Sequence, residues 1–247
     1  AFRMDPEVPL VVPEVNPQAI LKHKGIIANP NCSTIIMVMA LKPIYDLAKI
    51  KRVIVSTYQA VSGAGKEGID ELDAQVREHS EGREMTANIL PSASAEKHYP
   101  IAFNLIPQID VFCDNLYTKE EMKMVNETKK IMEDYEMRIT ATTIRVPVYR
   151  SHSESVNIEL EKEVDLGAMR EALAKFPGVT VQDDPSKQEY PMPLYTSEKD
   201  DVYVGRLRRD ESCEKSYNMW VVGDQIRKGA ALNTLQIAET MIKNGWI

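Results

Sequence analysis

The sequence predicts an α+β fold built on a mixed, mostly antiparallel sheet. Two observations support this class: segments of strand length recur along the 247 residues, and single helices interrupt them. No repeat and no low-complexity linker divides the chain, whose length allows one large domain or two modest ones. A hydrophobic content of 43% with 27% charged residues is ordinary for a soluble globular protein.

The first half is expected to hold short strands and one long apolar helix. The helix is predicted by the apolar run from Ile35 to Leu47, which follows the turn Asn29-Pro30-Asn31. Alternating side chains predict a strand further along. The expected order is strands at 8–15 and 25–28, a helix from Cys32 to about 49–51, a strand at 52–58 and a charged amphipathic helix at 64–80.

The second half is expected to return to strands separated by helices. Thr118 caps a helix with an acidic first turn, and Pro177-Gly178 stops another helix. The expected order is a loop-rich segment at 81–107, a helix at 118–135, strands at 139–148 and 155–160, a helix at 165–176, strands at 202–207 and 217–222, and a last helix at about 229–244. The apolar face of this last helix must pack on another surface.

Charge and cysteine content exclude several classes of protein. The net charge of −7 gives no indication of a nucleic-acid or anionic-membrane partner. No apolar run approaches the ~20 residues of a membrane span, and the first residues lack a signal-peptide pattern. Cys32, Cys113 and Cys213 are an odd set at wide spacings, which argues against a disulfide framework and a zinc site. We therefore expect a cytoplasmic protein without a metal.

Cys32 is a candidate nucleophile. It stands where the long helix begins, with Ser33 and Thr34 in the first turn. The positive end of a helix dipole favours the thiolate, which is the reactive form of cysteine. Cysteine is also often a small buried hydrophobe, so position alone leaves both interpretations open.

Two other groups could bind a ligand. Gln59 follows a strand and precedes a turn containing Ser62 and Gly63, whose small residues let a phosphate or amide approach the backbone. Glu120 and Lys123 lie three residues apart and share a helix face, where they could bind a substrate amine and a phosphate. An ordinary turn and an ordinary helical salt bridge would show the same patterns.

Arg145 and His152 bracket the end of one strand and the start of the next. Histidine exchanges protons near neutral pH, as a thiol enzyme requires, and the planar guanidinium of arginine suits a carboxylate. Two solvated loop residues would be the common structural alternative.

Taken together, these motifs resemble bacterial aspartate-β-semialdehyde dehydrogenases. The match covers essentially the whole chain, in order and at the spacing of that family. The matching segments are Asn29-Pro30-Asn31-Cys32-Ser33-Thr34, residues 56–65 (STYQAVSGAG), Arg145-Val146-Pro147 with His152-Ser153-Glu154, residues 204–208 (VGRLR), residues 220–225 (WVVGDQ) and Lys228-Gly229-Ala230-Ala231.

The resemblance implies an oxidoreductase. Members catalyse the NADPH-dependent reductive dephosphorylation of L-aspartyl 4-phosphate to L-aspartate 4-semialdehyde, in the biosynthesis of lysine, methionine and threonine. They act as homodimers or dimers of dimers, with NADP as cofactor and no metal. The implied fold is a catalytic and dimerisation domain similar to the C-terminal domain of glyceraldehyde-3-phosphate dehydrogenase, with remnants of a Rossmann-type domain.

The same resemblance implies a role for each matching residue. Cys32 would form the acyl-thioester, Gln59 would orient it, and His152 would be the acid and base that activates Cys32. The implied substrate-binding residues are Arg145 for the α-carboxylate, Glu120 for the amine, Lys123 and Arg3 for the phosphate, and Asn31 in the phosphate-side turn. The implied cofactor contacts are Ser62, Gly63 and Gln225.

The pattern departs from the family at its start, where a nucleotide-binding domain is expected. We interpret residues 1–31 as the last strands of that domain, residues 32–225 as the catalytic and dimerisation domain, and residues 226–247 as a helix that packs on the nucleotide-binding domain. The 8–15 strand and the apolar face of the last helix would then be exposed unless another segment or chain covers them.

Other functions remain open from the sequence. N-acetyl-glutamyl-phosphate reductase is the related enzyme alternative, although the Gln59 turn and the Glu120–Lys123 pair favour the aspartyl substrate. A non-catalytic dimerisation module, or a catalytic half without its cofactor domain, would retain the same residues. A cysteine hydrolase using Cys32 and His152 is more remote, because it would not need Arg145, Lys123 or Arg3.

Overall fold

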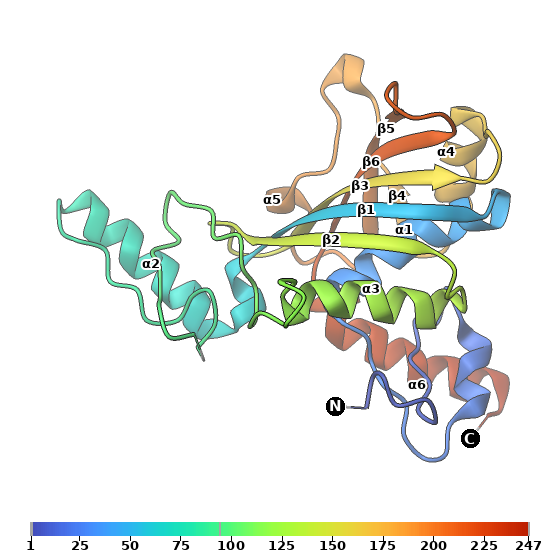
Figure 1. The fold of residues 1–247 in the computed structure, drawn as a ribbon, viewed down its shortest axis with the longest axis horizontal. Helices are drawn as coiled ribbons and strands as arrows, with labels where there is room; N and C mark the ends of the chain where they lie inside the picture. The colour runs from blue at the N-terminus through green and yellow to red at the C-terminus, as the bar shows by residue number, and fades with distance from the viewer. Residues whose placement is uncertain (1, 94, 247) are drawn as a thin grey trace.

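The computed structural model describes residues 2–93 and 95–246, and within them six strands form one mixed sheet (Figure 1). The strands are β1 (Ile50–Gln59), β2 (Arg138–Arg145), β3 (His152–Leu160), β4 (Val179–Val181), β5 (Val202–Arg209) and β6 (Ser216–Gly223). Their order across the sheet is β2-β1-β3-β6-β5-β4. The pairs β1–β3, β3–β6 and β5–β6 are antiparallel, whereas β1–β2 and β4–β5 are parallel. The predicted fold class is confirmed.

Helices cover one face of this sheet. The α-helices are α1 (Cys32–Leu47), α2 (Lys66–Ser80), α3 (Lys119–Met132), α4 (Leu166–Lys175), α5 (Pro193–Thr196) and α6 (Leu232–Asn244). Short 3-10 helices occupy Pro17–Lys22 (η1), Val61–Ala64 (η2) and Pro185–Lys187 (η3), and Arg227–Ala231 (η4) is a π-helix before α6. Helix α1 is the central element of the main core, because its residues from Ile35 to Leu41 are fully buried.

The opposite face of the sheet is covered only in part, where the segment 190–193 that leads into α5 lies against Trp220 of β6. In Figure 1 the strands lie in front of α1 and α4, with this open face toward the viewer. Alternate side chains of each strand point to it, and among them Thr142 of β2, Ser155 of β3 and Arg206 of β5 are exposed. We call this surface the open sheet face.

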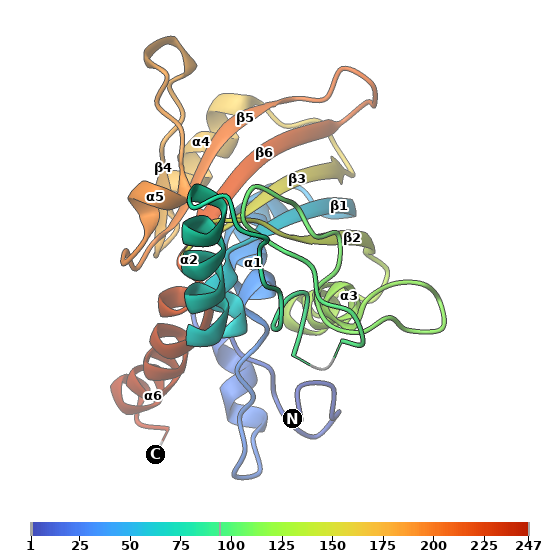
Figure 2. The same ribbon diagram turned by 90° about the vertical axis from the view of Figure 1, so that its left-hand side faces the viewer.

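Helix α2 and the segment 81–107 form a lobe beside the sheet (Figures 1 and 2). The lobe has its own apolar cluster, which is separate from the main core and includes Leu72, Leu90 and Ile101. Its described residues between 81 and 107 contain neither helix nor strand, as expected. Side chains of α2 hold this segment instead: Glu71 accepts hydrogen bonds from three successive backbone N–H groups, at residues 88–90, and Gln75 accepts two, at residues 101 and 102.

The first 31 residues differ from the prediction in two ways. The expected strands at 8–15 and 25–28 are reduced to a single bridge between Leu10 and Ala28. The segment 8–15 is also not exposed, because its apolar side chains are buried in the chain itself. Helix α6 packs on this region through Ile237, which shares a cluster with Ile20 of η1. The outward side chains of α6 remain exposed, as predicted for that helix.

Candidate active site

A cavity of about 430 Å³ lies at the start of α1, and ten of the eleven residues predicted from the sequence line it. They are Arg3, Asn31, Cys32, Gln59, Ser62, Gly63, Glu120, Lys123, Arg145 and Gln225. The eleventh, His152, is fully buried directly behind Gly63: a Cβ added at Gly63 would lie 3.2 Å from the His152 ring. The structure therefore brings the whole predicted set together.

Strand directions explain this convergence. Strands β1 and β2 are parallel, so their last residues, Gln59 and Arg145, pair at the same end of the sheet. Strand β3 runs antiparallel to β1, and its first residue, His152, therefore lies at that end as well. Helix α1 begins there with Cys32, and α3 adds Glu120 and Lys123 from its first turns.

Cys32 is a half-buried residue at the first position of α1. The helix start is well formed, because the Asn31 side chain caps it by accepting the Thr34 N–H at 3.1 Å. Desolvation by the surrounding protein, and then the charge of Glu120, raise the pKa of Cys32 to about 12. Hydrogen bonds from Ser33 and the charge of Arg145 lower it by less. The expected helix-start activation is thus outweighed, and the group is a thiol at neutral pH.

His152 is oriented by the backbone. Its Nδ1 accepts the Ala60 N–H at 3.1 Å, so in the neutral ring the proton sits on Nε2. Burial and the nearby Arg145 hold the pKa of His152 well below its ordinary value. Nε2 is buried and has no hydrogen-bond partner among residues 2–93 and 95–246. In this arrangement the neutral ring can donate a hydrogen bond from Nε2.

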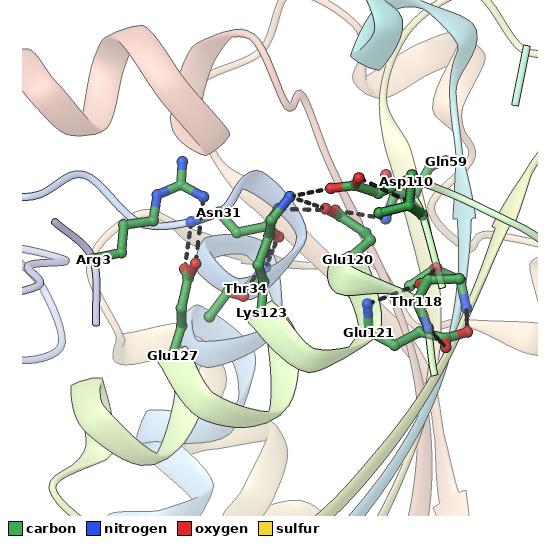
Figure 3. Close-up of polar contacts among 12 residues, drawn as sticks. Arg3, Asn31, Thr34, Gln59, Asp110, Thr118, Glu120, Glu121, Lys123 and Glu127 are labelled. Atoms are coloured by element: carbon green, nitrogen blue, oxygen red, sulfur yellow. Dashed lines mark hydrogen bonds and ion pairs between the residues drawn. The ribbon is translucent and has the colours of Figure 1, made fainter. Parts of the chain in front are cut away.

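Glu120 is the centre of the polar network in Figure 3. Its Oε1 accepts hydrogen bonds from the side-chain amides of Asn31 at 2.8 Å and Gln59 at 3.3 Å. Its Oε2 lies 3.3 Å from the Lys123 ammonium. This buried carboxylate therefore links Asn31, which precedes the nucleophile, and Gln59 to the Lys123 ammonium at the cavity edge.

Arg145, at the end of β2, and Gln225, after β6, also line the cavity. Arg145 donates from Nη1 to the Ala60 carbonyl at 2.7 Å, while its buried Nε finds no partner in the described part of the chain. Gln225 accepts the Ser151 N–H at 2.9 Å and donates to the Ser62 hydroxyl. Gly63 leaves its backbone bare here, because a Cβ would lie 2.7 Å from Arg145 Nη1.

Sequence reasoning missed several residues of this network. Asp110 accepts a hydrogen bond from Lys123 at 2.9 Å, so two carboxylates hold that lysine. Glu127 accepts the Asn31 N–H at 2.6 Å and lies 3.3 Å from Arg3 Nη1. The signal for Glu127 was its position seven residues after Glu120, on the same face of α3. No local pattern marks Asp110.

Glu154 is a third residue that was not predicted as part of the site. It lies on the same face of β3 as His152 and is fully buried, and both carboxyl oxygens lack partners among the described residues. Burial raises the pKa of Glu154 well above its ordinary value, so this carboxyl keeps its proton to a higher pH than an exposed glutamate does.

Residues 2–93 and 95–246 lack both a candidate metal site and a membrane-spanning helix. They contain no cluster of three or more His, Cys, Asp or Glu side chains that could hold a metal ion. None of their helices has the length and apolar character needed to cross a membrane.

Comparison with known proteins places these residues in a family. The family described as "Semialdehyde dehydrogenase, dimerisation domain" matches residues 41–228. Aspartate-semialdehyde dehydrogenase from Aquifex aeolicus is 56% identical over 249 residues, covering 100% of this chain and 72% of the relative. The enzyme of the same name from Bacillus subtilis is 52% identical, covering 98% of this chain and 70% of the relative.

Solved structures agree with the sequence relatives. The crystal structure of aspartate semialdehyde dehydrogenase II from Vibrio cholerae, described as complexed with ASA, superposes with a TM-score of 0.91 at 46% identity. The match covers 98% of this chain and 70% of that one. On this evidence the chain belongs to the aspartate-semialdehyde dehydrogenase family.

Proposed function

We propose that the chain catalyses the NADPH-dependent reductive dephosphorylation of L-aspartyl 4-phosphate to L-aspartate 4-semialdehyde and phosphate, serving lysine, methionine and threonine biosynthesis. The observation that carries this proposal is the cavity at the start of α1. There a cysteine lines the same cavity as the cations Arg3, Lys123 and Arg145 and the buried carboxylate of Glu120. A substrate with two anionic ends and one amine matches this set of charges.

In the proposed complex, each charged group of the substrate binds its own set of residues. The α-ammonium pairs with Glu120, and the α-carboxylate binds Arg145, whose buried Nε is free to donate. The phosphate binds Arg3 and Lys123 beside Asn31. These contacts hold the acyl carbon next to Cys32, which converts the attack into an intramolecular step.

Thioester formation needs the Cys32 proton to leave. The charge of Glu120 raises the pKa of this thiol, and the substrate ammonium neutralises that charge when it binds. The thiolate Sγ then bonds to the acyl carbon, and the carbon–oxygen bond to phosphate breaks. The leaving phosphate takes the electron pair and the Cys32 proton and departs as hydrogen phosphate, whose charge Arg3 and Lys123 stabilise.

The cofactor side of the cavity fits a nicotinamide. Gly63 offers bare backbone, and Ser62 and Gln225, which are hydrogen-bonded to each other, line the same cavity as Cys32. When bound there, the nicotinamide supplies the hydride that reduces the thioester to the aldehyde level. We assign to His152 only the acid part of its predicted role, because its Nε2 already carries the proton. The Nε2–H holds the developing oxyanion. Gln59 orients the thioester carbonyl. Expulsion of the Cys32 thiolate then releases the aldehyde.

The organisation of the chain follows the same proposal. Residues 1–31 belong to the nucleotide-binding domain, residues 32–225 form the catalytic and dimerisation domain, and residues 226–247 pack on the nucleotide-binding domain. The match to a dimerisation domain supports a homodimer, or a dimer of dimers. We place the protein in the cytoplasm. We assign the dimer contact to the open sheet face.

The test is phosphate-dependent reduction of NADP by aspartate semialdehyde, measured for the wild type and for Cys32→Ser. We expect the serine variant to lose activity by on the order of 10³-fold or more, because an alkoxide forms far less readily than a thiolate. Cys113→Ser is the matched control, since Cys113 is also partly buried but does not line the cavity.

A thioester also has a direct signature. Wild-type protein incubated with aspartate semialdehyde and NADP, but without phosphate, should accumulate the thioester. Mass spectrometry should then find an aspartyl adduct on the peptide containing Cys32 and none on the Cys113 peptide. Retained activity in Cys32→Ser, or an adduct on another residue, would contradict the assignment.

A further inference from the structure

We propose that Lys130 is a positioning residue for the phosphate: it ties the backbone of residues 3–8 to α3 and thereby holds Arg3 at the cavity. Nothing in the sequence marked Lys130, which does not line the cavity itself. The inference rests on the proposed function, because a phosphate group is the ligand assigned to Arg3.

The Lys130 ammonium uses all its donors on one short segment. Its Nζ donates to the backbone carbonyls of Arg3 at 2.8 Å, Asp5 at 2.7 Å and Val8 at 2.8 Å. An ammonium has three N–H groups, so this set is complete. The described residues of the segment form no helix and no strand, and a residue on α3 therefore takes the place of a sheet partner.

Contacts of its own hold the Arg3 side chain, in addition to the Lys130 bond to its backbone. Its Nε donates to the Asn29 carbonyl at 2.9 Å, and its Nη1 lies 3.3 Å from Glu127 (Figure 3). Glu127 is almost completely buried, whereas the Arg3 side chain is 34% exposed and lines the cavity. The guanidinium is thus fixed on one side, and its Nη2 group has no hydrogen-bond partner within residues 2–93 and 95–246, so it can bind an anion.

Four residues on one face of α3 contribute to the proposed phosphate site. Glu120, Lys123, Glu127 and Lys130 follow one another at intervals of three and four residues, so they share a face. The first two line the cavity, and the last two hold the segment that brings Arg3 to it. Without Lys130 the segment would have to be ordered when phosphate binds, and this entropy cost would weaken phosphate binding.

The test compares Lys130→Met with Lys129→Met in the phosphate-dependent assay. Lys129 is the neighbouring lysine on the same helix, and its side chain makes no hydrogen bond or ion pair within the described residues. We expect Lys130→Met to raise the KM for inorganic phosphate by about tenfold, while kcat and the KM for the semialdehyde stay within about twofold. Lys129→Met should leave all three unchanged.

Trypsin gives a readout that does not depend on activity. It cleaves after Arg3, whose carbonyl is bonded to Lys130, so native wild-type protein should be cut slowly there. Lys130→Met should be cut faster at this bond, as followed by mass spectrometry. Lys130→Arg keeps the charge but not the three-pronged geometry, and should give an intermediate phosphate KM. It is also the variant to use if Lys130→Met does not fold.

The outcomes separate the two proposals. An unchanged phosphate KM in Lys130→Met, with normal wild-type turnover, overturns this inference and leaves the proposed function intact. A kcat loss without any change in phosphate KM also overturns it, because a positioning role for phosphate requires the KM effect. A folded wild-type protein with no phosphate-dependent turnover contradicts the proposed function and this inference together.

Discussion

Two opposing effects act on the proton of Cys32. The N–H groups at the start of α1 and the charge of Arg145 favour the thiolate, whereas burial and Glu120 favour the thiol. Burial is the largest contribution, and it keeps the nucleophile protonated in the free protein. A substrate that neutralises Glu120 would shift the balance, so the reactive form would develop mainly after binding. The free protein therefore presents little thiolate to other electrophiles.

Glu120→Gln should therefore make the free thiol more reactive. Removing the carboxylate charge lowers the pKa of Cys32, and the pH profile of alkylation by iodoacetamide should move about one unit toward lower pH. The rate is followed by mass spectrometry of the Cys32 peptide, without substrate. Glu136→Gln, at an exposed position after α3, is the control and should leave the profile in place. An unshifted profile in Glu120→Gln would show that its charge does not act on the sulfur.

At the scale of single elements, β3 places a buried acid two residues from His152. The folded protein keeps Glu154 protonated, because burial raises its pKa, while the unfolded chain loses this proton above about pH 4.5. The unfolded state then binds fewer protons than the native state, so this group makes the free energy of unfolding fall as pH rises. The loss reaches at most about 1.4 kcal/mol per pH unit, up to the folded pKa.

Glu154→Gln should remove this pH dependence. The amide does not titrate, so the Tm of the variant relative to wild type should be higher at about pH 8 than at about pH 5. Glu161→Gln, one residue beyond the same strand and exposed, is the matched control. Equal Tm differences at both pH values would mean that Glu154 is ionised in the folded protein. Thermal unfolding followed by circular dichroism makes the measurement.

The elements that the sequence predicted well have local causes. Helices α1, α3 and α4 begin and end within a few residues of the prediction, because their caps, apolar runs and proline stops are adjacent in sequence. The prediction of a strand at 8–15 was wrong for a physical reason. There the Asn16 side chain accepts the Val12 N–H and donates to the Leu10 carbonyl, which replaces strand pairing. Strand β4 was missed because it has only three residues.

The site shows the same division between local and distant causes. Residues that face the cavity lie within recognisable motifs, and the structure brings them together. Asp110, Glu127 and Lys130 act on other protein groups, and their partners lie at a distance along the chain: Lys130 and Arg3 are 127 residues apart. A single sequence gives no indication of such a contact. Glu154 lay inside a recognised motif, but its burial follows from the packing of α1 on the sheet.

For the whole molecule, the open sheet face is the surface that the proposed dimer would cover. Tyr58 and Trp220 lie in ring contact on it, with centroids 5.5 Å apart. A cavity of about 350 Å³ is lined there by Trp220, Ser155 and Arg206. Aromatic rings and arginine are the residue types that dominate protein interfaces. The chain covers this surface only in part: the segment 190–193 borders the cavity, and Pro191 accepts the Trp220 ring N–H at 3.1 Å.

Ser155→Arg should therefore shift the protein from dimer to monomer. Ser155 is exposed in the middle of the face, so the larger charged side chain leaves the fold of one chain unchanged but obstructs a flat contact. Size-exclusion chromatography with light scattering gives the mass of each form. Gln18→Arg, at an exposed position in η1, is the control. A Ser155→Arg protein that stays dimeric would move the interface elsewhere.

The α2 lobe has a consequence for the way the molecule fluctuates. Its apolar cluster is separate from the main core, and two side chains of α2 hold an otherwise irregular segment. Such a unit opens at a lower free energy than the sheet, so its amide protons should exchange with solvent before those of β1 and β3. The lobe joins the sheet through η2, which carries Ser62 and Gly63. One wall of the cavity therefore belongs to a cooperative unit that can open and close while the wall formed by α1 remains closed.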